Sequence, residues 1–441
     1  MEAKLLLCVL LLALALPALA QEVKPEAGLL AGVARVDITA PLQQFPTVSL
    51  GGFGDRQGKP ATSVHDPMYC RTVVLVAGGQ KVALVATELL MIAPGMKEAL
   101  LKELAKEGYR ADNLLLAATH SHSSPECLHP GGDAWPLAFG KFHPAFYAWM
   151  VGRLAECVRQ ADANLQPAQL GFASAPLQDM NRNRRETGGD LVDPALTVMK
   201  VTTRGVNPQR TLALVSNFTA HPTMVGSDSF AISGEWPGAM SRELETKLGQ
   251  GIALFFNGAQ GDQTTSGDYG SGWERVAAYG KAMAGLTAGL AGKVKLSAEV
   301  TLAVSGRDWL LPPQQVSPAF MQSTGEEYEM TPEAAKQLLG KLFPPKVRMQ
   351  AIRVGEGLFM AIPGEAIVEL GLAMKRDSTA LGAKFPMAIG LADDYVGYIL
   401  SSEQYRQGGY ESGTSFYGPE LGTQLVGEMK ETVRPLYAHQ P

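Results

Sequence analysis

The stretch Leu114–Pro125 constrains the fold of this chain more than any other, because it joins a buried strand to a pair of histidines. The apolar run from Leu114 to Ala118 predicts a short buried strand. It opens into Thr-His-Ser-His, where the alternation of strand side chains predicts that His120 and His122 lie on one face. Such a pair indicates a metal or catalytic site, since neutral imidazole is a common metal ligand, but it also fits two polar residues that begin a loop.

The first 20 residues have the three parts of a signal peptide. A short charged start is followed by an apolar run, Leu5–Leu16, that is too short to span a bilayer. Ala18-Leu19-Ala20 then supplies a cleavage site before Gln21. We therefore expect an exported protein, secreted or periplasmic, with no transmembrane segment after signal cleavage.

Composition excludes several classes of protein. Hydrophobic residues make up 46% and charged residues 18% of the chain, which indicates a large core and argues against global disorder. The net charge of −5 and the lack of a basic run argue against a nucleic-acid partner. After cleavage only Cys70, Cys127 and Cys157 remain, an odd number at irregular spacing that predicts no disulfide framework and no cysteine-based metal site.

Strand and helix patterns interleave along the chain. Two hairpins are predicted, one at Gly78-Gly79 between Thr72–Val76 and Val82–Ala86, and one between Val347–Val354 and Gly357–Ile362. Apolar spacing predicts helices at Met96–Glu107, Pro144–Ala163, Pro237–Gly249, Glu274–Leu290, Pro332–Leu342 and Glu420–Leu436. These patterns predict an α/β or α+β fold, with mixed parallel and antiparallel sheets flanked by helices, in a single large domain over residues 28–438.

Two later stretches contain further residues that could bind a metal ion. The predicted strand Thr211–Asn217 leads to His221, which repeats the arrangement of a strand that ends near a histidine. Glu365 follows the second predicted hairpin in a Pro-Gly-Glu sequence. Each has a simpler interpretation, since His221 fits a loop residue and Glu365 fits the acidic first turn of a helix.

Four separated stretches together resemble the N-terminal catalytic domain of the neutral (non-lysosomal) ceramidase family. Each is similar to a family motif, namely Ala-Thr-His-Thr-His-Ser-x-Pro, the second histidine segment, Pro-Gly-Glu, and Tyr-Glu-Gly-Ala-Ser-Thr-x-Tyr-Gly-Pro. The matching stretches are Ala118–Pro125, Ala220–Thr223 with Ile232–Glu235, Pro363–Glu365, and Tyr410–Pro419. The similarity runs from about Ala34 to the C-terminus, and the order of the pieces makes it more specific than any single motif.

The resemblance implies one zinc ion per chain, held by His120, His221, Glu365 and Tyr398. Two imidazoles, a carboxylate and an open position fit a hydrolytic zinc site. It further implies that His122 and Arg182 face the substrate. Tyr395 competes with Tyr398 for its role, and Arg184 and Arg185 compete with Arg182.

Two departures from the family pattern bear on function. The family has a serine, proposed to act in catalysis, where this chain has Thr264, which keeps the hydroxyl but adds a crowding methyl group. The family also carries a C-terminal immunoglobulin-like domain, which we expect this chain to lack.

We therefore predict an exported zinc-dependent amide hydrolase that acts on ceramide or a related N-acyl lipid, an amphipathic small molecule presented at a membrane or micelle. His122 protonates the leaving amine, Tyr398, His122 or Arg182 donates to the oxyanion, and Thr264 positions the substrate. The aromatic, glycine-punctuated stretch Asp393–Pro419 suits an apolar chain.

Two alternatives remain open, and two other kinds of metallohydrolase fit the sequence less well. A metallohydrolase of other specificity would act on N-acyl amino acids or esters. A metallo-β-lactamase requires aspartate where this chain has Ser124, and the hairpins argue against an amidohydrolase barrel. A non-catalytic envelope binding protein that retains the fold would bind no zinc.

Overall fold

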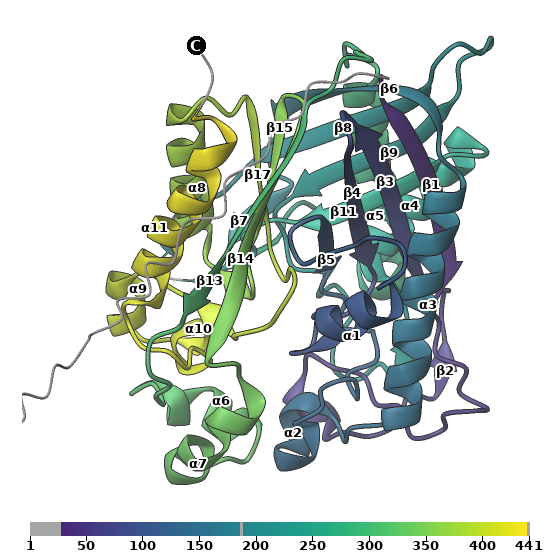
Figure 1. The fold of residues 1–441 in the computed structure, drawn as a ribbon. Coiled ribbons are helices and arrows are strands. Elements are labelled where there is room, and N and C mark those ends of the chain that lie inside the picture. The colour runs from purple at the N-terminus through teal and green to yellow at the C-terminus, as the bar shows by residue number, and fades with distance from the viewer. Residues whose placement is uncertain (1–27, 186–187, 439–441) are drawn as a thin grey trace, which may run out of the picture.

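Two β-sheets pack face to face and carry helices on their outer sides in the computed structural model, which describes residues 28–185 and 188–438 (Figure 1). The predicted signal peptide lies outside the described residues, and the domain limits at 28 and 438 stay a prediction. The mixed α/β class with parallel and antiparallel pairing is confirmed.

The larger sheet has eight strands. Its order is β11 (Ile252–Asn257), β9 (Thr211–Phe218), β8 (Ala195–Thr203), β6 (Gln166–Pro176), β1 (Leu30–Asp37), β3 (Tyr69–Ala77), β4 (Gln80–Thr87) and β5 (Leu114–Ala118). The two outermost pairs, β11–β9 and β4–β5, are parallel, and the others are antiparallel. The β3–β4 hairpin turns at Gly78 and Gly79, whose positive φ angles of 55° and 75° suit glycine, so the predicted hairpin is confirmed.

The smaller sheet has four strands from the C-terminal part of the chain. Its order is β13 (Leu302–Leu310), β14 (Lys346–Val354), β15 (Gly357–Ala361) and β17 (Phe385–Ile389), with only β15–β17 parallel. Apolar side chains of both sheets form one buried cluster between them, in which the ring of Phe256 lies 6.2 Å from that of Phe359. This core holds the two sheets together through burial of apolar area.

Helices close the outer faces of the sheets. On the larger sheet, α3 (Pro144–Ala163) packs on β1 and β3, and α4 (Glu235–Leu248) and α5 (Gly272–Ala291) cover β6, β8 and β11. On the smaller sheet, α8 (Val368–Ala380) and α11 (Leu421–Val433) cover β13, β14 and β17. The remaining helices are α1 (Met96–Glu103), α2 (Pro136–Phe139), α6 (Thr324–Glu327), α7 (Pro332–Leu342), α9 (Ser402–Arg406) and α10 (Tyr410–Gly413). Among the described residues, no helix is both long and apolar enough to cross a bilayer.

Three further sheets have only two short strands each. They pair β10 (Ala231–Ile232) with β2 (Ser63–Val64), β12 (Gln263–Thr265) with β7 (Asn181–Asn183), and β16 (Glu365–Ala366) with β18 (Tyr398–Ile399). The apolar patterns of the sequence predict no strand or helix over residues 181–185 or 393–419, where the structure forms β7, β18, α9 and α10. Two of these short ladders carry side chains of the candidate site.

Candidate functional site

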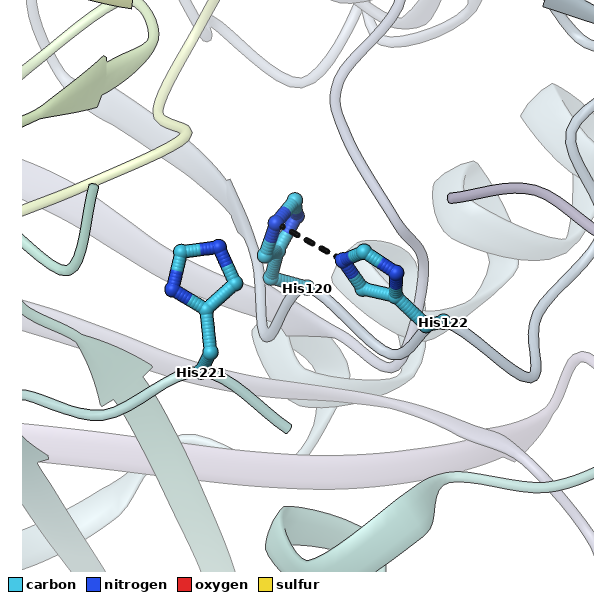
Figure 2. Close-up of side chains that lie close together, drawn as sticks. All are labelled: His120, His122 and His221. Carbon is cyan, nitrogen blue, oxygen red and sulfur yellow. Dashed lines mark hydrogen bonds between the residues drawn. The ribbon is translucent and has the colours of Figure 1, made fainter. Parts of the chain in front are cut away.

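His120 and His122 lie close together because the backbone turns between them, and not because they alternate along a strand. Strand β5 ends at Ala118, and His120 has a left-handed φ of 76°. The expectation that both imidazoles alternate off a continuing strand is therefore wrong, although the two rings do converge, with centroids 4.7 Å apart and planes nearly perpendicular (Figure 2). His120 Nδ1 lies 2.7 Å from the Leu90 carbonyl oxygen, so this nitrogen donates and Nε2 keeps its lone pair.

His221 is held in the same way from the other end of the large sheet. It follows β9, and its backbone N–H donates to the carbonyl oxygen of Gln263 in β12. Its Nδ1 lies 3.0 Å from that same oxygen, which leaves the Nε2 lone pair facing the cluster. The indole N–H of Trp236 donates to the His221 carbonyl oxygen at 3.3 Å and fixes the loop.

Glu365 and Tyr398 arrive together on the β16–β18 ladder, where they are register partners. Glu365 Oε2 lies 3.1 Å from Nε2 of His120 and 3.1 Å from Nε2 of His221. The Tyr398 hydroxyl oxygen lies 3.4 Å from His221 Nε2. The structure therefore brings together all four predicted ligands, His120, His221, Glu365 and Tyr398.

The charges at this cluster fit a metal cation. Two imidazole lone pairs point at one carboxylate oxygen, an arrangement of three acceptors that has no donor among them unless an imidazole binds a second proton. Burial and the positive charge of Arg184 lower the pKa of His221 to about 4, so this ring is neutral at pH 7. Burial raises the pKa of Glu365, but His120 and His221 outweigh it and hold that pKa well below 4.5. Neutral imidazoles and an ionised carboxylate are the states in which these groups bind a metal.

His122 is a candidate for either a ligand or a proton-transfer role. Its Nε2 lies 3.2 Å from His120 Nε2, and one ligand atom from each of the three histidines lies within 4.8 Å of the others (Figure 2). Its Nδ1 is buried without a hydrogen-bond partner in the part of the chain described. Burial lowers the pKa of His122 well below 6.5. Gly52, at φ 86°, lies against the ring, where a Cβ would approach Nδ1 to 2.2 Å.

Arg56 connects the loops around His122 through hydrogen bonds to their backbone. Its side chain is fully buried and donates to the carbonyl oxygens of Gly51, His122, Ser229 and Gly226. These carbonyls come from three separate segments, so one guanidinium ties the glycine loop, the histidine loop and the loop before β10 together.

Arg184, and not Arg182, reaches the cluster. Its guanidinium donates to the Tyr398 hydroxyl oxygen at 2.9 Å, to the Gly261 carbonyl oxygen at 2.9 Å, and to Glu411 at 3.0 Å. The second carboxylate oxygen of Glu411 accepts from Arg185 at 2.6 Å. Arg182 is exposed on β7 opposite Thr264 and lines neither cavity at the site.

Thr264 lies beside the cluster without lining it. Its backbone forms a bridge with His221, and its side chain is half-buried. It is absent from the walls of both cavities at the site. A positioning role for its hydroxyl therefore stays a prediction.

Two adjoining cavities meet at these residues. The outer cavity, of about 750 Å³, has polar walls that include Arg184, Arg185, Glu327 and Glu411. The inner cavity, of about 70 Å³, is lined by His120 and Glu365 and by a largely aromatic wall. Both cavities share Gly52, His122, Tyr398 and Tyr410, so the cluster lies at the boundary between them.

Several residues of the site could not be assigned a role from the sequence. The Tyr395 hydroxyl donates to Glu365 Oε1 at 2.9 Å and orients that carboxylate, so the competition between Tyr395 and Tyr398 resolves into two different roles. Tyr410 packs edge-on to Tyr398 with ring centroids 5.9 Å apart. Glu126, four residues after His122, lines the inner cavity. A single carboxylate shortly after the histidine pair was the available signal for it.

Comparisons with known proteins agree on one family. The family described as neutral/alkaline non-lysosomal ceramidase, N-terminal, matches residues 29–287. The neutral ceramidase of Pseudomonas aeruginosa is 25% identical, covering 94% of this chain and 72% of that protein, and the neutral ceramidase of Mycobacterium tuberculosis is 23% identical, covering 87% and 74%. The crystal structure of neutral ceramidase from P. aeruginosa has the same fold, with a TM-score of 0.79 at 21% identity over 94% of this chain and 75% of that one.

Proposed function

This chain belongs to the neutral/alkaline non-lysosomal ceramidase family, and from that premise we propose that it is a zinc-dependent hydrolase of an N-acyl lipid amide, ceramide or a related compound. The observation that carries the proposal is the meeting of His120 Nε2, His221 Nε2 and Glu365 Oε2 at 3.1 Å, with Tyr398 beside them. Nitrogen and oxygen donors of this kind suit zinc. A zinc ion in such a site activates water and polarises a carbonyl group.

The surrounding residues supply the remaining parts of amide hydrolysis. His122, held neutral by burial, takes a proton from the attacking water and passes it to the leaving amine. Arg184 and Tyr398 donate to the oxyanion that forms at the carbonyl carbon, and their mutual hydrogen bond keeps both in place. Glu411 neutralises Arg184 and holds its guanidinium against Tyr398.

The two cavities support an amphipathic substrate. The outer cavity is large and has polar walls with Arg184, Arg185 and Glu411, so it accommodates the polar part of an amphipathic substrate. Aromatic rings line the inner cavity and exclude bulk water from the reacting groups. A nucleic-acid partner does not fit the net charge of −5.

Hydrolysis measurements on the purified protein test the proposal. Decanoyl ceramide, an N-decanoyl amino acid and a decanoyl ester are compared with and without a chelator, followed by add-back of zinc, magnesium or calcium. We expect chelator-sensitive release of decanoic acid from the ceramide or the N-acyl compound, restored by zinc. Activity that survives complete metal removal refutes the zinc site, and ester cleavage alone refutes the amide specificity. Intact folded protein that binds no zinc and hydrolyses nothing identifies a binding protein.

We also propose export to the periplasm or the medium, because the first 20 residues have the sequence of a signal peptide. Fractionation of expressing cells, with N-terminal sequencing of the product, tests this. Mature protein that begins at Gln21 outside the cytoplasm is expected. Cytoplasmic protein that retains Met1 contradicts it.

A further inference from the structure

The stretch Ile232–Glu235 belongs to one of the motifs that resemble the family, but it has no part in the proposed reaction. It ends at the first residue of α4, where Glu235 is buried and only 1% exposed. Glu235 lines neither cavity at the site. Its φ of 54° is a left-handed conformation that residues other than glycine adopt rarely. Such an outlier points to a role, which the contacts of the residue identify.

The carboxylate of Glu235 binds the loop that carries His221. One oxygen, Oε1, accepts the backbone N–H groups of Met224 and of Val225, the latter at 3.3 Å. The other oxygen accepts the N–H of Trp236 at 2.7 Å, and the Trp236 indole in turn donates to the His221 carbonyl oxygen. The loop from His221 to Val225 is therefore fixed at both of its ends to the start of α4.

The residues just before Glu235 bind the loop that carries the other two histidines. Ser121 lies between these histidines in the sequence, and its hydroxyl group donates to the Ser233 carbonyl oxygen at 2.7 Å. The backbone N–H of Ser233 donates to the Ser123 carbonyl oxygen at 2.9 Å. The short stretch Ser233–Trp236 therefore connects the two loops whose three imidazoles form the cluster.

We propose that Glu235 is a positioning residue, whose carboxylate holds the His221 loop against α4 and so sets the 4.8 Å separation of the His221 and His120 ring centroids. This inference rests on the proposed function, because its consequence is the affinity of the site for a metal ion. Loss of a group that orients a metal ligand costs about 10- to 100-fold in affinity. The hydrogen bonds of Ser233 and of the Trp236 indole remain when the carboxylate is removed, so the loop loosens while the fold is retained.

A carboxylate in the first turn stabilises a helix in any case, so the test has to separate metal binding from stability. Glu245, near the other end of α4, supplies the control. It is 6% exposed, accepts from Arg71 at 2.6 Å and from the Ala253 N–H at 3.2 Å, and lines neither cavity at the site. Glu235→Ala and Glu245→Ala each remove a buried carboxylate of the same helix, but only the first removes a contact with a histidine loop.

Zinc affinity of the metal-free full-length protein is measured by competition with a chromophoric chelator at pH 8, because burial raises the pKa of Glu235 to about 7. We expect Glu235→Ala to lower the affinity by about 10- to 100-fold, and Glu235→Gln, which keeps one acceptor oxygen, by an intermediate factor. Glu245→Ala should lower the melting temperature and leave the affinity within about threefold of the wild type. The visible spectrum of the cobalt(II)-substituted protein, which reports coordination geometry, should change in Glu235→Ala and not in Glu245→Ala.

Equal zinc affinities of Glu235→Ala and the wild type overturn the inference, and so do equal losses in Glu235→Ala and Glu245→Ala, which indicate a general effect of stability. If either alanine variant does not fold, Glu235→Gln and Glu245→Gln are compared by the same criterion. If the wild type binds no metal ion, the proposed function fails, and magnetic resonance of the histidine ring nitrogens in the metal-free proteins decides the inference. A shift of the His221 ring signals in Glu235→Ala alone supports it, and unchanged signals, or equal shifts in Glu245→Ala, refute it.

Discussion

Glu365 and Tyr398 are register partners on a parallel ladder of only two residues per strand, and both side chains reach His221 Nε2, Glu365 at 3.1 Å and Tyr398 at 3.4 Å. The ladder delivers a carboxylate and a phenol to the histidines as one rigid pair. Tyr395, from the same segment, orients the carboxylate through its other oxygen. The metal-binding capacity of the site therefore depends on this short ladder.

Loss of the Glu365 charge is expected to remove the metal. Glu365→Gln leaves the size of the side chain unchanged but takes away the carboxylate that lies 3.1 Å from both His120 and His221. Even an outer partner of a metal ligand is worth about 10- to 100-fold in affinity, so we expect a loss of more than about 100-fold in zinc affinity. Competition with a chromophoric chelator measures it. Tyr395→Phe, which removes only the hydrogen bond to Glu365, should cost less, and equal losses would contradict the assigned roles.

Substitution of His122 separates its two candidate roles. Since we assign it to proton transfer, His122→Ala should retain most of the bound zinc and lose about 10²- to 10⁴-fold in kcat. Metal content by elemental analysis, together with turnover, measures both quantities on the same sample. Parallel loss of zinc and activity would make His122 a ligand.

Arg184 and Arg182 lie in the same segment, so the same substitution at each gives a test and its matched control. Arg184→Gln removes the donor to Tyr398 and should lower kcat by about 10²- to 10³-fold, the usual value of one oxyanion donor. Arg182→Gln alters an exposed side chain and should change kcat/KM by less than about threefold. Steady-state kinetics on both variants check this. A larger effect at Arg182 would restore the assignment made from the sequence.

Stability should fall as the pH rises toward 9 because of Glu126. Burial raises the pKa of Glu126 to about 8, although Arg56 opposes this, whereas the unfolded chain ionises near the ordinary value of 4.5. The folded protein thus keeps a proton that the unfolded chain has released. The resulting stability is fully present below about pH 4.5 and is lost as the pH rises through about 8, by an amount on the order of a few kcal/mol.

Glu126→Gln cannot ionise, so its melting temperature should depend less steeply on pH than that of the wild type. Thermal unfolding of both metal-free proteins between about pH 5 and pH 9 measures the difference. Glu235 and Asp394, whose burial raises each pKa to about 7, are common to both proteins and cancel in the comparison. Parallel curves would show that Glu126 ionises freely in the folded state.

The sequence predicted long elements well and short ones poorly. Helices Pro144–Ala163 and Pro332–Leu342 have the predicted limits, because many residues of helical period define them. Strands β7, β12, β16 and β18 have two or three residues each, too few for any period to be read. Glu365 and Tyr398 lie on these short strands, so the full set of four ligands was predicted only through the resemblance to a family.

The sequence also could not show which of two neighbouring residues reaches the site. Arg182 and Arg184 are chemically identical and two positions apart, and only the end of β7 at Asn183 directs Arg184 inward. His120 adopts a left-handed backbone conformation that no strand pattern predicts. In both cases tertiary contacts, and not local propensity, set the orientation of the side chain.

The position of the ligands along the chain makes the site a long-range cross-link. His120 and His221 extend from the large sheet, whereas Glu365 and Tyr398 come from segments around the small sheet, and the segment matched to the family, residues 29–287, contains only the histidines. An ion bound by all four would clamp the two halves of the chain much as a disulfide does, by closing a loop of nearly 280 residues between His120 and Tyr398. Assembly of the centre would then be a late event in folding, and the apo protein should come apart most easily between its two sheets.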